Sequence, residues 1–171
     1  MLGRDVTELL ECLERAGLPV WLDGGWGIDA LLARRTRAHA DLDLVIARVH
    51  LMRAEVALAR LGFQHAPEAS PGLPARLVLR DAAGRQVDLH PVVLDEHGNG
   101  YQDLGDGTWC LYPAEGLTGT GEIEGRVVRC ITPDLQLRHH LGYPPQGHDR
   151  ADMARLAQGF GLVLPPPYTT A

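Results

Sequence analysis

The most informative absence in this 171-residue chain is lysine, because all 16 basic residues are arginine. Without lysine there is no phosphate-binding loop that ends in Gly-Lys-Ser/Thr, no Schiff-base enzyme and no lysine-dependent protein kinase. Serine is nearly absent as well. The single serine, Ser70, lies in Ala-Ser-Pro-Gly, which lacks the pattern of a serine-hydrolase nucleophile. These two absences exclude several large enzyme classes.

Cysteine, long apolar runs and excess positive charge are also scarce. The three cysteines (Cys12, Cys110 and Cys130) are odd in number and far apart, so neither a disulfide framework nor a zinc site is supported. No stretch approaches 18 apolar residues, and the first residues lack an apolar signal region. The net charge is −6, without a basic stripe. We therefore expect a soluble, cytoplasmic protein that binds neither membrane nor nucleic acid.

Helical and strand patterns are interleaved along the chain, which predicts an α/β or α+β fold with a mixed sheet flanked by helices. Asp5 and Glu8 form a capping pattern for the first helix. We expect a core of residues 1–131 and a helical C-terminal extension of residues 132–171, packed as one unit, with a loosely ordered proline-rich tail. The predicted helices are 5–17, 25–34, 51–61, 132–142 and 149–158. The predicted strands are 20–22, 42–47, 76–80, 86–93 and 108–111, with further short strands around residues 122–131 and Gly125 in a turn.

The segment Asp41-Leu42-Asp43-Leu44 carries the clearest chemical signal. On a strand, successive side chains alternate between faces, so both carboxylates project to one side. They lie about 6.6–6.8 Å apart along the strand and repel each other unless a cation lies between them. Mg²⁺ accepts a few carboxylate oxygens and completes its octahedron with water and substrate phosphates. An Asp-x-Asp at a solvated strand end, without metal, is the alternative.

A glycine turn precedes this pair. Asp23-Gly24-Gly25 follows a short strand and opens a helix, where backbone N–H groups and the helix N-terminus favour an anion. Arg37 and His39 lie between the turn and the paired aspartates, and an arginine there could hold phosphate through two hydrogen bonds. A plain Gly-Gly turn is the alternative.

A third carboxylate occurs in Gln86-Val87-Asp88-Leu89-His90. The alternation places Asp88 and His90 on one face, so Asp88 is a candidate third metal ligand or general base. His90 suits a structural or a catalytic role equally. Together, the turn and the carboxylates suit nucleotidyl transfer from a metal-bound triphosphate, which requires no lysine.

Three segments resemble the antibiotic nucleotidyltransferases of the polymerase-beta-like superfamily: residues 21–29, 37–44 and 87–92. The sequence is most similar to the small lincosamide nucleotidyltransferases and next to the aminoglycoside 2″-nucleotidyltransferases. A weaker likeness continues through residues 137–143 and 148–152, so it covers roughly residues 18 to 158.

The resemblance implies that Asp41 and Asp43 hold Mg²⁺, with Asp88 as base or additional ligand. It implies that Gly24 and Gly25 line the triphosphate of ATP or another NTP. Arg37 and His39 would contact phosphate. The implied reaction transfers a nucleoside monophosphate to a hydroxyl of an antibiotic and releases pyrophosphate, and the resemblance also allows a homodimer.

Two other function classes stay open. Asp-x-Asp also occurs in metal-dependent enzymes that transfer sugars from sugar nucleotides, and a nucleotide-binding, antitoxin-like module without turnover would carry the same turn. Trp109 could stack on an acceptor, as could Tyr101 and Tyr112, although aromatic residues in such strands more often belong to the core. His140 and Tyr143 are candidates for contact with the base.

Overall fold

The computed structural model describes residues 1–67 and 72–169. Ser70 lies outside the described residues. Within them, a mixed sheet has the strand order β1-β2-β5-β4-β3, and β6 and β7 extend it from the end of β5. Its strands are β1 (Val20–Leu22), β2 (Asp41–Ala47), β3 (Gln64–His65), β4 (Leu77–Arg80), β5 (Gln86–Leu94), β6 (Gly100–Asp103) and β7 (Trp109–Tyr112). A separate hairpin joins β8 (Thr120–Ile123) to β9 (Arg126–Arg129).

Strand pairing confirms the predicted mixed sheet. The central pair, β2 and β5, is parallel over the whole of β2, whereas β1 and β4 pair antiparallel to these two strands. Parallel strands need a long crossover connection. Residues 48–85 provide it, and they include α3 as well as the two outer strands β3 and β4.

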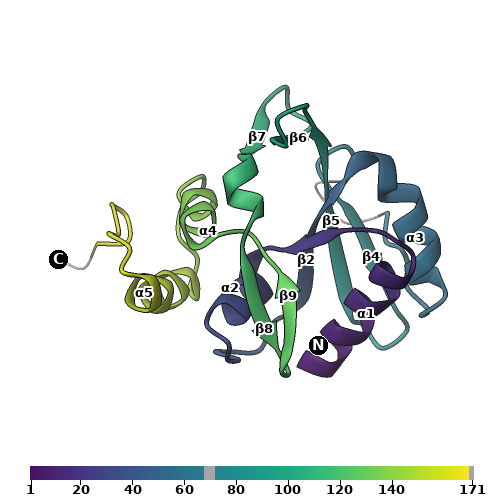
Figure 1. Ribbon diagram of the computed structural model, residues 1–171, viewed down its shortest axis with the longest axis horizontal. Coiled ribbons are helices and arrows are strands. Elements are labelled where there is room, and N and C mark those ends of the chain that lie inside the picture. The colour runs from purple at the N-terminus through teal and green to yellow at the C-terminus, as the bar shows by residue number, and fades with distance from the viewer. Residues whose placement is uncertain (68–71, 170–171) are drawn as a thin grey trace.

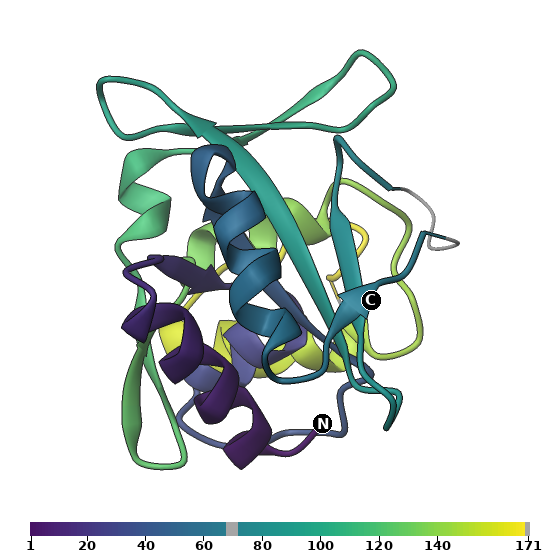
Figure 2. The same cartoon turned by 90° about the vertical axis from the view of Figure 1, so that its right-hand side faces the viewer.

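Helices cover both faces of this sheet (Figures 1 and 2). They are α1 (Gly3–Arg15), α2 (Gly24–Leu31), α3 (Leu51–Ala59), α4 (Pro133–His140) and α5 (Asp149–Phe160), together with the short 3-10 turns η1 (Arg48–His50) and η2 (Ala114–Leu117). Figure 2 shows α1 and α3 in front of the strands and α4 and α5 behind them. The second of these faces carries the paired aspartates.

The main core lies under α1 and α3. Leu42 and Leu44 of β2 and Leu89 of β5 are fully buried in it, against Leu9 and Leu58 of the two helices. Burial of each such side chain contributes roughly 1.5–3 kcal/mol. Because side chains alternate along a strand, this packing turns the intervening residues of β2 toward the opposite face.

Most helix boundaries shift by one or two residues from those predicted, and two of the differences have a clear local cause. The first helix begins at Gly3, so Asp5 lies inside it and is not the N-cap; its carboxylate accepts a hydrogen bond from the backbone N of Leu2 at 2.7 Å. The second helix ends at Leu31 and not near residue 34, because Ala33 has a left-handed backbone with φ of 49°.

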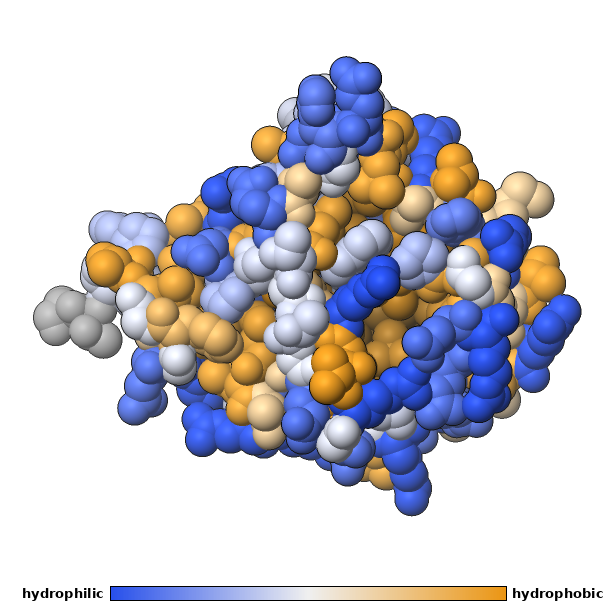
Figure 3. Space-filling model, viewed as in Figure 1, coloured by the Kyte–Doolittle hydropathy of each residue, from blue (hydrophilic) through white to orange (hydrophobic). Residues whose placement is uncertain are grey.

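The C-terminal tail is better packed than predicted. Tyr168 is buried against Ile28, Met153 and Leu156, and its hydroxyl donates to the carbonyl of His140 at 2.9 Å. Figure 3 shows apolar residues at the surface on the α5 side, whereas hydrophilic residues cover α1. In the part of the chain that the structure describes, no helix combines the length and apolar character needed to cross a membrane.

Candidate active site

Three carboxylates meet on the face of the sheet opposite the main core. The parallel register of β2 and β5 places Asp43 directly opposite Asp88, and Asp41 opposite Gln86. Paired strands lie about 4.8 Å apart. The two strands that sequence analysis singled out are thus neighbours, and their acidic residues form one cluster.

The cluster concentrates negative charge. Burial and the neighbouring carboxylates of Asp43 and Asp88 raise the pKa of Asp41 above its ordinary value. Burial and the charge of Asp43 likewise raise the pKa of Asp88. A cation between the carboxylates would remove this repulsion and stabilise their ionised forms.

Asp88 is held by two neighbours. One of its oxygens accepts from Arg76 Nη1 at 2.5 Å, and the other accepts from Gln86 Nε2 at 2.7 Å. The Asp88 side chain has no exposed surface, whereas a quarter of the Arg76 side chain is exposed. Arg76 and Gln86 therefore fix the orientation of the Asp88 carboxylate. The positive charge of Arg76 offsets part of the negative charge of the cluster.

His90 joins the cluster from β5. Its Nε2 lies 3.1 Å from Asp43 Oδ1. Burial alone would lower the pKa of His90, but the hydrogen bond to Asp43 and the charges of Asp43, Asp23 and Asp88 raise it. The structure thus places His90 in direct contact with one of the paired aspartates.

The glycine turn packs against the same aspartate. Gly24 begins α2 with φ of +55°, and a Cβ at this position would collide with Asp43 Oδ2. A Cβ on Gly25 would collide with His39 and press on Arg37. Only glycine allows this close approach, so the N-terminus of α2 and the paired aspartates form one site.

Gly24→Ala tests this close approach. We expect the variant to lose at least about 100-fold in kcat/KM, since the new methyl group displaces the Asp43 carboxylate. It also loses about 1 kcal/mol of unfolding free energy because of the left-handed backbone. Gly17→Ala is the matched control: Gly17 has φ of +67°, but a Cβ there meets open space. An equal loss of activity in both variants would refute the packing argument.

Arg37 and His39 lie beside the turn. Arg37 Nε donates to Asp152 Oδ2 of α5 at 2.8 Å, and about a quarter of the Arg37 side chain is exposed. His39 is buried; its Nε2 lies 2.5 Å from Asp29 Oδ2, and its Nδ1 has no hydrogen-bond partner among the described residues. The structure brings both next to Gly25, and their contact with phosphate stays a prediction.

The donor set fits Mg²⁺. Carboxylate oxygens are the protein ligands that Mg²⁺ prefers, and it binds through one or two of them together with substrate phosphates. Asp41 and Asp43 supply such a pair on a partly open face. Within residues 1–67 and 72–169, no group of three His, Cys, Asp or Glu side chains could hold a metal by itself.

Sequence analysis missed a half-buried ion pair that ties α4 to the turn. His139 Nδ1 lies 3.7 Å from Asp23 Oδ2, and Asp23 Oδ1 caps α2 by accepting from Gly24 N at 2.7 Å. Burial would lower the pKa of His139, but Asp23 and Cys110 raise it to about 10. Burial would raise the pKa of Asp23, but His139 lowers it. The pair is separated by more than 100 residues, so no local pattern indicates it.

This pair predicts a pH-dependent stability. Because folding raises the pKa of His139 from about 6.5 to about 10, its contribution is complete below about pH 6.5 and is lost as the pH rises toward 10. We expect His139→Gln to lower the free energy of unfolding most near pH 6, with the difference from wild type shrinking toward pH 10. Urea unfolding at a series of pH values measures it, and a constant difference would contradict the pair.

The structure places the remaining aromatic candidates in different parts of the molecule. Tyr112 is buried, and its hydroxyl lies 3.3 Å from Asp23 Oδ2. Tyr101 and Trp109 are exposed and line a different cavity with Pro74. Tyr143 is partly exposed, and its ring packs against His140.

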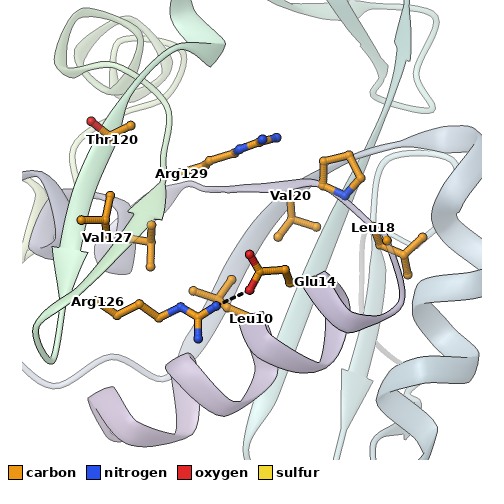
Figure 4. A pocket seen from close by; sticks show the side chains of 11 residues that line it. Leu10, Glu14, Leu18, Val20, Thr120, Arg126, Val127 and Arg129 are labelled. Carbon is orange, nitrogen blue, oxygen red and sulfur yellow. Dashed lines mark hydrogen bonds and ion pairs between the residues drawn. The ribbon is translucent and has the colours of Figure 1, made fainter.

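Another groove, of about 460 Å³, lies between α1 and the β8–β9 hairpin (Figure 4). Its carboxylate, Glu14, is bound by Arg126, and Leu10 and Val127 line it. It contains none of the residues of the acidic cluster.

A mixed sheet with paired carboxylates beside a glycine turn defines the class of the protein, a nucleotidyltransferase. Comparison with known proteins gives the family. A family model described as aminoglycoside-2″-adenylyltransferase matches residues 5–156, and the chain belongs to this family.

The relatives agree with the class. The chain is 27% identical to a lincosamide resistance protein of Staphylococcus haemolyticus, over 91% of this chain and 98% of that protein. It is 30% identical to a 2″-aminoglycoside nucleotidyltransferase of Klebsiella pneumoniae, over 73% of this chain but 64% of that protein. The family description and the name of the Klebsiella pneumoniae enzyme agree with the nucleotidyltransferase class that the sequence predicts.

Solved structures show the same fold. The lincosamide antibiotic adenylyltransferase LnuA, bound to lincomycin, has a TM-score of 0.78 at 25% identity and covers 90% of this chain and 94% of its own. The complex of ANT(2″)-Ia with adenylyl-2″-tobramycin has a TM-score of 0.72 at 21% identity, over 93% of this chain and 89% of its own. The predicted nucleotidyltransferase-like fold is confirmed.

Proposed function

We propose that the protein transfers AMP from Mg²⁺-bound ATP to a hydroxyl group of a small antibiotic, with a lincosamide as the preferred acceptor, and so confers resistance. One observation carries this proposal: the register of β2 and β5 brings Asp43 and Asp88 together beneath the Gly24 turn. This juxtaposition supplies metal ligands, a base and an anion-binding helix N-terminus at one point.

Each group has a role in the transfer. Asp41 and Asp43 would hold Mg²⁺, and the bound ion would supply positive charge to offset that of the phosphates. The N–H groups at the start of α2 bind phosphate, and Arg37, oriented by Asp152, adds a charged contact. His39, which lies against Gly25, would be a further contact to phosphate.

Asp88 is the general base. The acceptor hydroxyl forms a bond to the α-phosphorus as its proton moves to Asp88. The bond from that phosphorus to the bridging oxygen breaks, and pyrophosphate leaves with the electron pair. The raised pKa of Asp88 brings it closer to the operating pH, which suits a base.

Two observations favour a lincosamide over an aminoglycoside. The lincosamide resistance protein matches this chain over 98% of its own length, whereas the 2″-aminoglycoside enzyme matches over 64%. The TM-score is also higher for the lincomycin-bound structure. The net charge of −6 suits either class, because both carry amines.

Mass spectrometry of complete reactions tests the proposal. The protein is incubated with Mg²⁺, each of the four NTPs, and panels of lincosamides and aminoglycosides. We expect a lincosamide that has gained the mass of an adenylyl group, which is AMP less one water. A transferred sugar would instead indicate a sugar-nucleotide transferase. Binding of ATP without pyrophosphate release on any acceptor would indicate a non-catalytic module.

A further inference from the structure

A line of hydrogen-bonded side chains leads from β7 to the acidic cluster. The Tyr112 hydroxyl lies 3.0 Å from Gln102 Oε1, and Gln102 Nε2 lies 3.1 Å from His90 Nδ1. His90 Nε2 in turn lies 3.1 Å from Asp43 Oδ1. Gln102 and Tyr112 are buried, at 5% and 2% exposure, so water does not compete for these bonds.

The backbone carbonyl of Ala75 fixes the direction of the line. Gln102 Nε2 also lies 2.8 Å from Ala75 O, and a carbonyl oxygen only accepts. The Gln102 amide nitrogen must therefore face Ala75, and its second hydrogen points to His90 Nδ1. The opposite amide orientation would place two oxygens together and leave buried groups unpaired.

His90 is oriented as a result. A ring nitrogen that accepts from Gln102 carries no proton, so the proton of the neutral ring lies on Nε2 and is donated to Asp43 Oδ1.

We propose that Gln102 is a positioning residue for nucleotidyl transfer: it holds His90 with Nε2–H directed at Asp43 Oδ1 and thereby fixes the Asp43 carboxylate. With Oδ1 engaged, Oδ2 is the oxygen that lies against Gly24. Partners that orient a metal-binding carboxylate in this way affect metal binding and catalysis without touching substrate. The link to catalysis rests on the proposed function, whereas the hydrogen-bond direction does not.

Nitrogen-15 NMR of the protein with labelled histidine shows which ring nitrogen of His90 carries the proton. The measurement needs neither metal nor substrate. His90 is assigned by comparison with the spectrum of His90→Gln, and the spectra are recorded at increasing pH until the ring signals stop changing. We expect the Nε2–H form in the wild type and a shift toward Nδ1–H in Gln102→Glu, whose carboxylate accepts. Tyr112→Phe, which keeps the shape of the ring, should shift the signals in the same sense but less. An Nδ1–H form in the wild type, or unchanged signals in both variants, would overturn the proposal.

Kinetics test the positioning role separately. In Gln102→Met we expect kcat to fall about 10–100-fold, with little change in the KM for the acceptor. The affinity of Gln102→Met for Mg²⁺ should also fall, and calorimetry measures this affinity without an acceptor. Gln158→Glu on the exposed face of α5 is the control for the added charge of Gln102→Glu. Unchanged kcat and Mg²⁺ affinity in Gln102→Met would refute the role, while a failure of the proposed function would leave the NMR result intact.

Discussion

Replacing Asp43 with Asn is expected to lower kcat by at least about 1,000-fold, because the amide removes a charged ligand of the proposed Mg²⁺, which is worth several kcal/mol in the transition state. Asp43 combines the three functional contacts of the site: it faces Asp88 across the sheet, binds His90 and packs against Gly24. No other residue of the cluster does so among those described.

The fold should survive this substitution. Asn has the same shape as Asp, the Asp43 side chain is a quarter exposed, and loss of its charge relieves repulsion with Asp41 and Asp88. Unfolding in urea should therefore show no loss of stability. Asp134→Asn, on an exposed turn of α4, is the control with the same chemical change and should keep full activity. Retained activity in Asp43→Asn would refute the metal site.

Asp88→Asn is expected to lower kcat about 100- to 10,000-fold while the affinity for ATP changes little, since general-base catalysis contributes about this much. Amide nitrogen at this position cannot accept the proton of the acceptor hydroxyl. Single-turnover rates, together with ATP binding by calorimetry, separate the two effects. An equal loss of nucleotide affinity would identify Asp88 as a metal ligand instead.

The pH profile gives a second test of the same residue. Since the pKa of Asp88 is raised, kcat should fall on the acid side at a pH above the ordinary carboxyl range, as the base becomes protonated. In Asp88→Asn this limb should disappear. An unchanged acid limb in the variant would show that another group acts as the base.

Local patterns were sufficient for the mixed α/β class and for the two acidic strands. The alternation in residues 41–44 and 86–90 reflects a period of two that any half-buried strand must obey, so the shared face of Asp41 and Asp43 followed from the sequence. The glycine turn was predictable for a similar reason, because a short strand that runs into Gly24 and Gly25 must turn there.

Strand pairing and long-range contacts could not be predicted from such local patterns. The register that puts Asp43 opposite Asp88 depends on the crossover through residues 48–85. Gln102 belongs to β6, a glycine-flanked strand that sequence analysis did not predict, and it reaches His90 only because β6 pairs with β5. Arg37 and Asp152 are 115 residues apart. Hydrogen bonds of this kind are properties of the packed fold and leave no local signal.

Transfer of isotopic label tests the central claim most directly. The protein is incubated with Mg²⁺, a lincosamide, and ATP labelled at either its α- or its γ-phosphorus, and the antibiotic is then isolated. The proposed reaction places the α label on the antibiotic and leaves the γ label in released pyrophosphate. Label from the γ position on the antibiotic, or no label from either, would contradict nucleotidyl transfer by this site.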